Sequence, residues 1–352
     1  FPQTIDILKT RSAPLAIELV IGDYTKIEFD KSFYAVILQY PAKYGQIYNY
    51  ETLSKELQDN EIAIVVAADL LSLSLLKPPG EWGADVVVGT TQRFGIPLGY
   101  GGPHAAYFAT KEKYKRNIPG RIIGVSEDVD GNSALRMALQ TREQHIKREK
   151  ATSNICTSQV LLAVMASMYA VYHGPKKIKQ IASNIHLYAS ILSDALKELG
   201  YHQMNESFFD TLLIQTNDAS IENIKVYAED AKMNFNYISE DTLSISIDEK
   251  DDFQNIKDIL TVFIKAKKYP DYTEILNKIL SVEEKNTTQY INPINMRKSD
   301  FLNYEVFNSY HSETELMRYI KSLENKDLSL THSMIPLGSC TMKLNAAAEL
   351  FS

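Results

Sequence analysis

A single acidic residue stands where an α/β sheet places its ligand sites. Asp69 follows the apolar run 62–67, whose β-branched residues are typical of a buried strand. Open α/β sheets bind ligands at the carboxyl ends of their strands. A carboxylate there can pair with a protonated ring nitrogen, as in enzymes that use pyridoxal phosphate as an electron sink. A helix cap or turn acid is the simpler alternative, and position alone leaves both open.

A glycine-rich loop follows over residues 95–103. Gly99, Gly101 and Gly102 permit positive φ angles or a close backbone approach, which phosphate-binding loops use. The loop matches neither G-x-x-x-x-G-K-S/T nor G-x-G-x-x-G ahead of a helix. The pattern therefore favours a structural turn.

A second polar cluster lies near the end of the sequence, after Gly338. Its side chains offer hydroxyl, thiol, amine and amide groups that could line a polar pocket: Ser339, Cys340, Thr341, Lys343 and Asn345. No base can be placed beside Cys340, which disfavours a nucleophilic thiol. The seven histidines show no close pair at metal-ligand spacing and no partnering cysteine, so we expect no metal site.

Composition and charge limit the class of protein. The 352 residues are 45% hydrophobic and 23% charged, which is typical of a globular protein with two or three domains. Lys and Arg total 37 against 44 acidic residues, and a net charge of −7 gives no basic face for nucleic acid or an anionic membrane. Two distant cysteines indicate reduced thiols. With no signal peptide or membrane span after Phe1 and an unfinished element at Ser352, we interpret the chain as a fragment.

The first third of the sequence has the pattern of an α/β domain. A helix-like stretch from Tyr50 to Leu57, with Asn49 as its candidate cap, separates two apolar strands. This order is typical of a parallel βαβ unit buried on both faces. The expected strands and apolar runs are 33–39, 62–67, 85–88 and 105–109.

Helices and short strands alternate further along, as in a small α+β domain. A helix over 158–172 is expected to end at His173-Gly174-Pro175, and a longer amphipathic helix to run from Lys176 to Leu199. A charged, helix-compatible stretch precedes them at 134–150. The remaining expected elements are strands at 211–215, 235–238 and 242–247 and helices at 221–232, 253–265 and 312–323.

Several stretches together resemble the P-protein family of the glycine cleavage system, the glycine decarboxylases. They occur in the order expected of that family over nearly the whole chain. The matching stretches are 83–92 (GADVVVGTTQ), 95–104 (GIPLGYGGPH), 141–157 (TREQHIKREKATSNICT), 311–320 (HSETELMRYI) and 333–345 (SMIPLGSCTMKLN).

The resemblance implies an α/β protein of the fold-type I pyridoxal-phosphate-dependent class. Such a protein has two homologous halves, each with a large α/β domain and a smaller α+β domain. We then expect 1–173 to be a partial large domain, 174–266 a small domain, 267–325 a linker and helix, and 326–352 the start of the second, catalytic half.

The resemblance also implies a degenerate cofactor site. The family's cofactor lysine precedes a glycine-rich loop, and Gln92 stands at or near that place here. An amide nitrogen is delocalised and forms no Schiff base, so Asp69 would remain as a relic of the acid that pairs with the pyridine nitrogen. The cofactor lysine is expected beyond Ser352. An aminotransferase or cysteine desulfurase would need a lysine before the loop, and Gln92 speaks against both.

The activity that the resemblance implies is the decarboxylation of glycine with pyridoxal phosphate. The aminomethyl group then passes to the lipoyl arm of the carrier H-protein. Expected partners are glycine, lipoylated H-protein and the other components of the system, in a homodimer or heterotetramer in the bacterial cytoplasm or mitochondrial matrix. The cluster 339–345 would line the pocket, and the fragment alone would be inactive. The alternative is a non-catalytic partner subunit or scaffold half.

Overall fold

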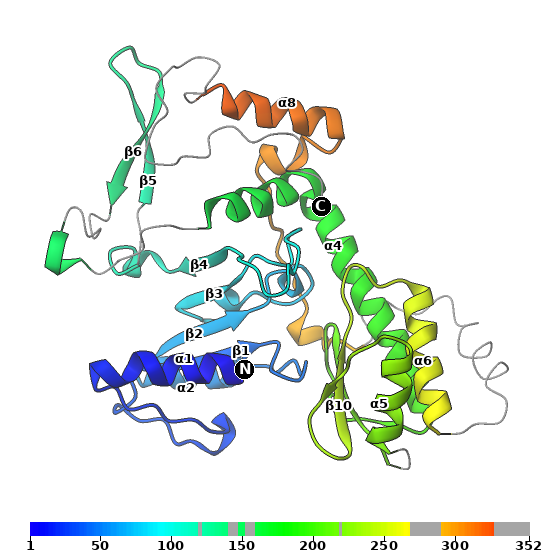
Figure 1. Cartoon of the computed structure of the whole chain (residues 1–352). Coiled ribbons are helices and arrows are strands. Elements are labelled where there is room, and N and C mark those ends of the chain that lie inside the picture. The colour runs from blue at the N-terminus through cyan, green and yellow to red at the C-terminus, as the bar shows by residue number, and fades with distance from the viewer. Residues whose placement is uncertain (119–121, 140–146, 152–158, 218–219, 268–289, 327–352) are drawn as a thin grey trace.

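The computed structural model describes residues 1–118, 122–139, 147–151, 159–217, 220–267 and 290–326. Within these ranges the chain forms two four-stranded sheets and a separate two-stranded ribbon. The long helix α4 (Val160–Glu198) runs from the side of the first sheet to the second, as Figure 1 shows.

The first sheet is largely parallel, as the sequence predicts. Its strand order is β1-β2-β3-β4, in which the first three strands are parallel and β4 is antiparallel to β3. Helix α2 (Glu51–Asp59) connects β1 to β2 and buries Leu53 and Leu57. The strands are β1 (Ala35–Tyr40), β2 (Ala63–Ala68), β3 (Val86–Thr90) and β4 (Ala106–Thr110).

The second sheet is antiparallel in the order β7-β8-β10-β9. Helix α6 (Phe253–Ala266) packs against both α4 and α5 (Ile221–Asp230). The structure confirms the helices predicted at 221–232 and 253–265 and the strand predicted at 211–215. Strand β7 was not predicted, because two residues are too few to show a strand pattern in the sequence. The strands are β7 (His202–Gln203), β8 (Thr211–Gln215), β9 (Asn236–Tyr237) and β10 (Thr242–Ser246).

Helix α4 is interrupted at Gly174, where the sequence predicts a helix end. Its φ of 63° and ψ of 177° are not helical, and Pro175 follows directly. The break lets the first segment bury Ala166 and Ala170 while the second buries a long apolar stripe against the second sheet. In the described part of the chain, α4 included, no helix is long and apolar enough to cross a bilayer.

The helix predicted over 134–150 is wrong at 134–139, which form a strand, whereas Arg148–Lys150 form a short 3-10 helix. Strand β6 (Ser133–Leu139) pairs antiparallel with β5 (Ile122–Glu127) through a turn in which Asp128 Oδ1 accepts hydrogen bonds from the amides of Asp130 and Asn132. The helix-forming residues of β6 favour a helix by propensity alone, but cross-strand pairing decides the outcome. Residues 140–146 lie outside the described ranges.

The described part of the predicted linker packs on the first sheet's domain. The amide of Lys77 donates to the carbonyl of Asn295, and the amide of Arg297 donates to the carbonyl of Leu75, each at 2.7 Å. Helix α8 (Glu313–Glu324) then begins with the predicted capping box between Ser312 and Glu315. The amino-terminal helix α1 (Pro2–Ser12) was not predicted, because it buries no residue and has no apolar period.

Replacement of Gly174 by alanine is expected to destabilise the fold by about 2 kcal/mol or more. A Cβ at this position would lie 2.6 Å from the carbonyl oxygen of Phe307, at a φ that side chains rarely adopt. Chemical unfolding of Gly174→Ala and of the control Gly80→Ala would measure the difference. Nothing lies within 4 Å of a Cβ at Gly80, so equal stability of the two variants would contradict the prediction.

Candidate functional site

Asp69 lies directly after β2 and serves as a turn acid. Its amide donates to the carbonyl of Tyr40 at 3.0 Å, which continues the pairing of β2 with β1. Its Oδ2 accepts a hydrogen bond from the amide of Ser72 at 3.0 Å, and the Ser72 hydroxyl donates back to the Asp69 carbonyl at 2.9 Å. On this side of its carboxylate, Asp69 is therefore a turn acid, which is the simpler of the two interpretations that the sequence leaves open.

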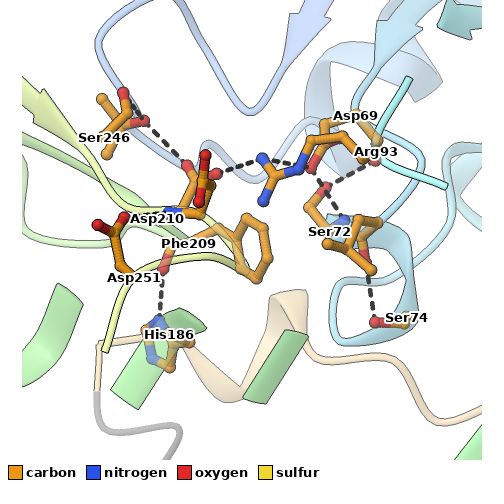
Figure 2. A network of polar contacts seen from close by, with 12 residues as sticks. Asp69, Ser72, Ser74, Arg93, His186, Phe209, Asp210, Ser246 and Asp251 are labelled. Carbon is orange, nitrogen blue, oxygen red and sulfur yellow. Dashed lines mark hydrogen bonds and ion pairs between the residues drawn. The ribbon is translucent and has the colours of Figure 1, made fainter. Parts of the chain in front are cut away.

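The other side of Asp69 faces the guanidinium of Arg93, as Figure 2 shows. Arg93 Nη1 lies 3.7 Å from Asp69 Oδ2 and 2.5 Å from Asp210 Oδ2. Asp210 immediately precedes β8, so one guanidinium joins acids from the two sheets. The side chains are only partly accessible, with exposed fractions of 23% for Arg93, 22% for Asp69 and 13% for Asp210.

The buried ion pairs shift the protonation equilibria of this cluster. Burial raises the pKa of Asp69, and the nearby charge of Asp210 adds to this, while Arg93 and the Ser72 amide act in the opposite direction. Burial also acts to lower the pKa of Arg93, but the carboxylates of Asp210 and Asp69 outweigh it and raise that pKa above its ordinary value. Arg93 is therefore a permanent cation between two acids.

Packing residues fix Arg93 in this position. Its guanidinium lies over the ring of Phe209, with its central carbon 5.6 Å from the ring centroid. The carbonyl of Phe209 is 2.7 Å from Nδ1 of the fully buried His186 (Figure 2). Because a carbonyl only accepts, Nδ1 carries a proton, and burial lowers the pKa of His186. A neutral imidazole thus holds the chain segment that carries Asp210.

Gln92 lies beside Arg93 and lines a hollow of about 550 Å³ together with Leu98, Gly99, Tyr100, Gly101, Gly102 and His104. The amides of Gly101 and Gly102 donate to carbonyls inside the loop, at about 3.0 Å each. These two amides are therefore used by the turn itself. The loop has the geometry of a structural turn, which is the interpretation that the sequence pattern favours.

The described residues around Asp69 do not fit a cofactor held as a Schiff base. Gln92 offers an amide in place of an amine, and the carboxylate of Asp69 is engaged by Arg93 and Ser72. Lys111, the first lysine after the glycine-rich loop, directs its Nζ to the Gly83 carbonyl and to Asp85, at 2.9 and 3.0 Å. No step through pyridoxal phosphate follows from this site.

The sequence predicts Asp69 and Gln92 as site residues but not Arg93 or Asp210. Arg93 could have been predicted because it follows Gln92 directly. Asp210 lies 117 residues from Arg93, and no local sequence pattern marks it as a site residue. The cluster Ser339, Cys340, Thr341, Lys343 and Asn345 lies outside the described residues. Within the described ranges, no three His, Cys, Asp or Glu side chains gather as metal ligands do.

The two sheets and their helices define a fold class. A largely parallel α/β domain joined to a smaller α+β domain is the architecture of the fold-type I transferase-like proteins. Residues 1–263 match the model of the family described as glycine cleavage system P-protein. The chain belongs to this family.

Curated relatives extend the similarity to almost the whole chain. It is 55% identical over 349 residues to a glycine dehydrogenase (decarboxylating) of Flavobacterium johnsoniae and 54% identical over 351 residues to one of Christiangramia forsetii. Each alignment covers 99% of this chain but only 36% of the relative. The chain thus spans about a third of the length of these relatives.

One solved structure supports the same fold. A crystal structure of glycine decarboxylase (P-protein) of the glycine cleavage system, in inhibitor-bound form, superposes with a TM-score of 0.69 at 27% identity. The superposition covers 75% of this chain and 63% of that chain.

The variant Arg93→Met is expected to lose about 3 kcal/mol of stability at neutral pH, because it leaves two facing carboxylates without their cation. The pKa of Asp69 then rises further, so the folded variant binds more protons than the unfolded chain. Its deficit relative to the wild type should shrink as the pH falls toward the ordinary carboxylate value of 3.8. Denaturant unfolding across this pH range measures the effect.

The exposed pair between Lys9 and Asp6 supplies the control for Arg93→Met. Their charged groups lie 3.6 Å apart on the surface of α1. Exposed pairs of this kind contribute about 0.5 kcal/mol or less, so Lys9→Met should change little at any pH. A similar small loss in Arg93→Met would contradict the assignment of Arg93 as the link between the two carboxylates.

Proposed function

We propose that this chain is part of a glycine dehydrogenase (decarboxylating). The complete enzyme would decarboxylate glycine and pass the aminomethyl group to the lipoyl arm of an H-protein, as part of the glycine cleavage system. The observation that carries this proposal is the identity of about 55% with such enzymes over 99% of the chain. Pyridoxal phosphate would supply the electron sink that decarboxylation needs.

Within that enzyme, this chain is proposed to be the non-catalytic first half. Gln92 cannot form a Schiff base, and the Asp69 carboxylate is paired with Arg93 and Ser72. The cofactor lysine is proposed to lie beyond Ser352, in the part of the relatives that this chain does not cover. The resulting role is structural, because this half would support the half that binds the cofactor.

The remaining expectations extend this proposal. The division into 1–173, 174–266, 267–325 and 326–352 follows the two-halved plan, with residues 339–345 opening the catalytic half and lining its pocket. Glycine and lipoylated H-protein would be the partners of the whole enzyme, in a homodimer or heterotetramer. Its setting would be the bacterial cytoplasm or the mitochondrial matrix.

Reductive trapping tests the assignment of this half. The full-length protein is incubated with pyridoxal phosphate, reduced with borohydride, digested and searched by mass spectrometry for a labelled lysine. We expect one stoichiometric label outside residues 1–352 and none within them, because Gln92 replaces the amine. A stoichiometric label at Lys111 or Lys343 would contradict the proposal.

Substitution of the cluster 339–345 tests the proposed pocket. Thr341→Ala and Lys343→Ala in the full-length enzyme are each expected to lower kcat/KM for glycine by at least about tenfold, the effect of losing one good hydrogen bond to a bound group. Release of carbon dioxide from carboxyl-labelled glycine gives the rate. The exposed Lys9→Ala serves as the control, and unchanged kinetics in both cluster variants would overturn the pocket assignment.

A further inference from the structure

Residues 290–312 form a strap that runs over the first sheet's domain and leads into α8, as the orange segment of Figure 1 shows. Its middle is held by Arg297, whose amide donates to the Leu75 carbonyl at 2.7 Å and whose Nη1 donates to the Leu73 carbonyl at 2.8 Å. Its last part packs on α4 at the break around Gly174. The strap therefore has one anchor on the first domain and another on α4.

The anchor on α4 depends on the absence of a side chain at Gly174. A Cβ there would lie 2.6 Å from the carbonyl oxygen of Phe307 and 2.7 Å from Cε1 of His311, so both strap residues rest on the break. A helix end leaves carbonyls without helical donors, and Pro175 has no N–H to offer. Nδ1 of His311 lies 2.7 Å from the carbonyl of Tyr172. Because a carbonyl only accepts, Nδ1 carries the proton of this hydrogen bond.

His173 stands at the same break, in surroundings that disfavour a positive charge. Its ring packs edge-on against the rings of Tyr169 and Tyr172, with centroids 4.3 and 5.1 Å away. Burial lowers the pKa of His173 below its ordinary value of 6.5, and the charges of Lys177 and His311 lower it further. Phenol groups are neutral near this pH, so the two tyrosines bring no negative charge.

The acids of the strap and of α8 do not offset these positive charges. Glu315 accepts hydrogen bonds from the amide and the hydroxyl of Ser312, at 3.2 and 2.8 Å, and is engaged in the capping box of α8. Glu305 and Glu313 lie in the same part of the chain, yet the pKa of His173 is set by burial and by its two basic neighbours. A proton on His173 would therefore meet like charges.

We propose that His173 makes the anchor of the strap on α4 pH-sensitive, so that the strap is held at neutral pH and released in mildly acidic solution. Release lets water reach the His173 ring and moves the charge of His311 away, so the released state binds a proton more readily. A proton on His311 alone would not release the strap, because a cation is favoured at the carboxyl end of a helical segment. The response therefore belongs to His173.

The direction of the effect follows from the lowered pKa of His173. The held state binds fewer protons than the released one, so its advantage is complete above pH 6.5 and is lost as the pH falls below that value. The anchor at Arg297 consists of hydrogen bonds to backbone carbonyls from a group that stays charged, so it does not respond. Release would free α8 while the middle of the strap stays in place. The inference is independent of the proposed function.

Hydrogen exchange of the full-length protein tests the release. Exchange is followed by mass spectrometry at about pH 7.5 and about pH 5.5 and corrected for the intrinsic rate at each pH. We expect protection over 304–324 to fall at least about threefold at the lower pH. The upper limit is about tenfold, since one unit below 6.5 a free imidazole is protonated about ten times as often as not. Protection over 291–300, around Arg297, should not change. Unchanged protection over 304–324, or an equal fall in both segments, would overturn the proposal.

Three variants separate the role of His173 from other effects of pH. His173→Phe keeps an aromatic ring beside Tyr169 but binds no proton, so protection over 304–324 should be the same at both pH values. His311→Ala loses the bond to the α4 carbonyl and should be poorly protected at both. His202 is exposed on β7, so His202→Gln should respond as the wild type does. A wild-type response in His173→Phe would contradict the assignment.

Discussion

One guanidinium held between two carboxylates links the two sheets. Asp69 directly follows a strand of the first sheet, Asp210 directly precedes a strand of the second, and Arg93 faces both at 3.7 and 2.5 Å. Each charge is costly to bury alone, and the cation makes the approach of two like charges tolerable. The neutral His186 behind Phe209 and the Ser72 amide hold the acids in place. A movement that opened this contact would separate these charges.

The same ion pair occupies the acid at this strand end. An acid after β2 is positioned as in cofactor-binding α/β proteins, yet here its free side faces Arg93 rather than an open pocket. The neighbouring Gln92 carries an amide, which forms no Schiff base. Residues 1–263 match the P-protein family. The described site, however, is an ion-pair cluster that links the two sheets.

A chain that spans about a third of its relatives is expected to expose surfaces that the whole protein covers. The ribbon of β5 and β6 fits this view, since four apolar side chains lie exposed on one of its faces. The contrast with the second sheet is informative. There Leu260 and Phe263 of α6 are completely buried, as part of the core that both domains share.

The sequence by itself determined the elements whose signals are local. Gly174 and Pro175 predicted the break in α4, Ser312 and Glu315 predicted the start of α8, and apolar runs predicted the parallel sheet, because capping, backbone freedom and burial period act over a few residues. Only the tertiary structure decided that β6 is a strand despite its helix-forming residues, and that Asp210 joins Arg93 across 117 residues. Cross-strand pairing and long-range ion pairs depend on segments that meet only after folding.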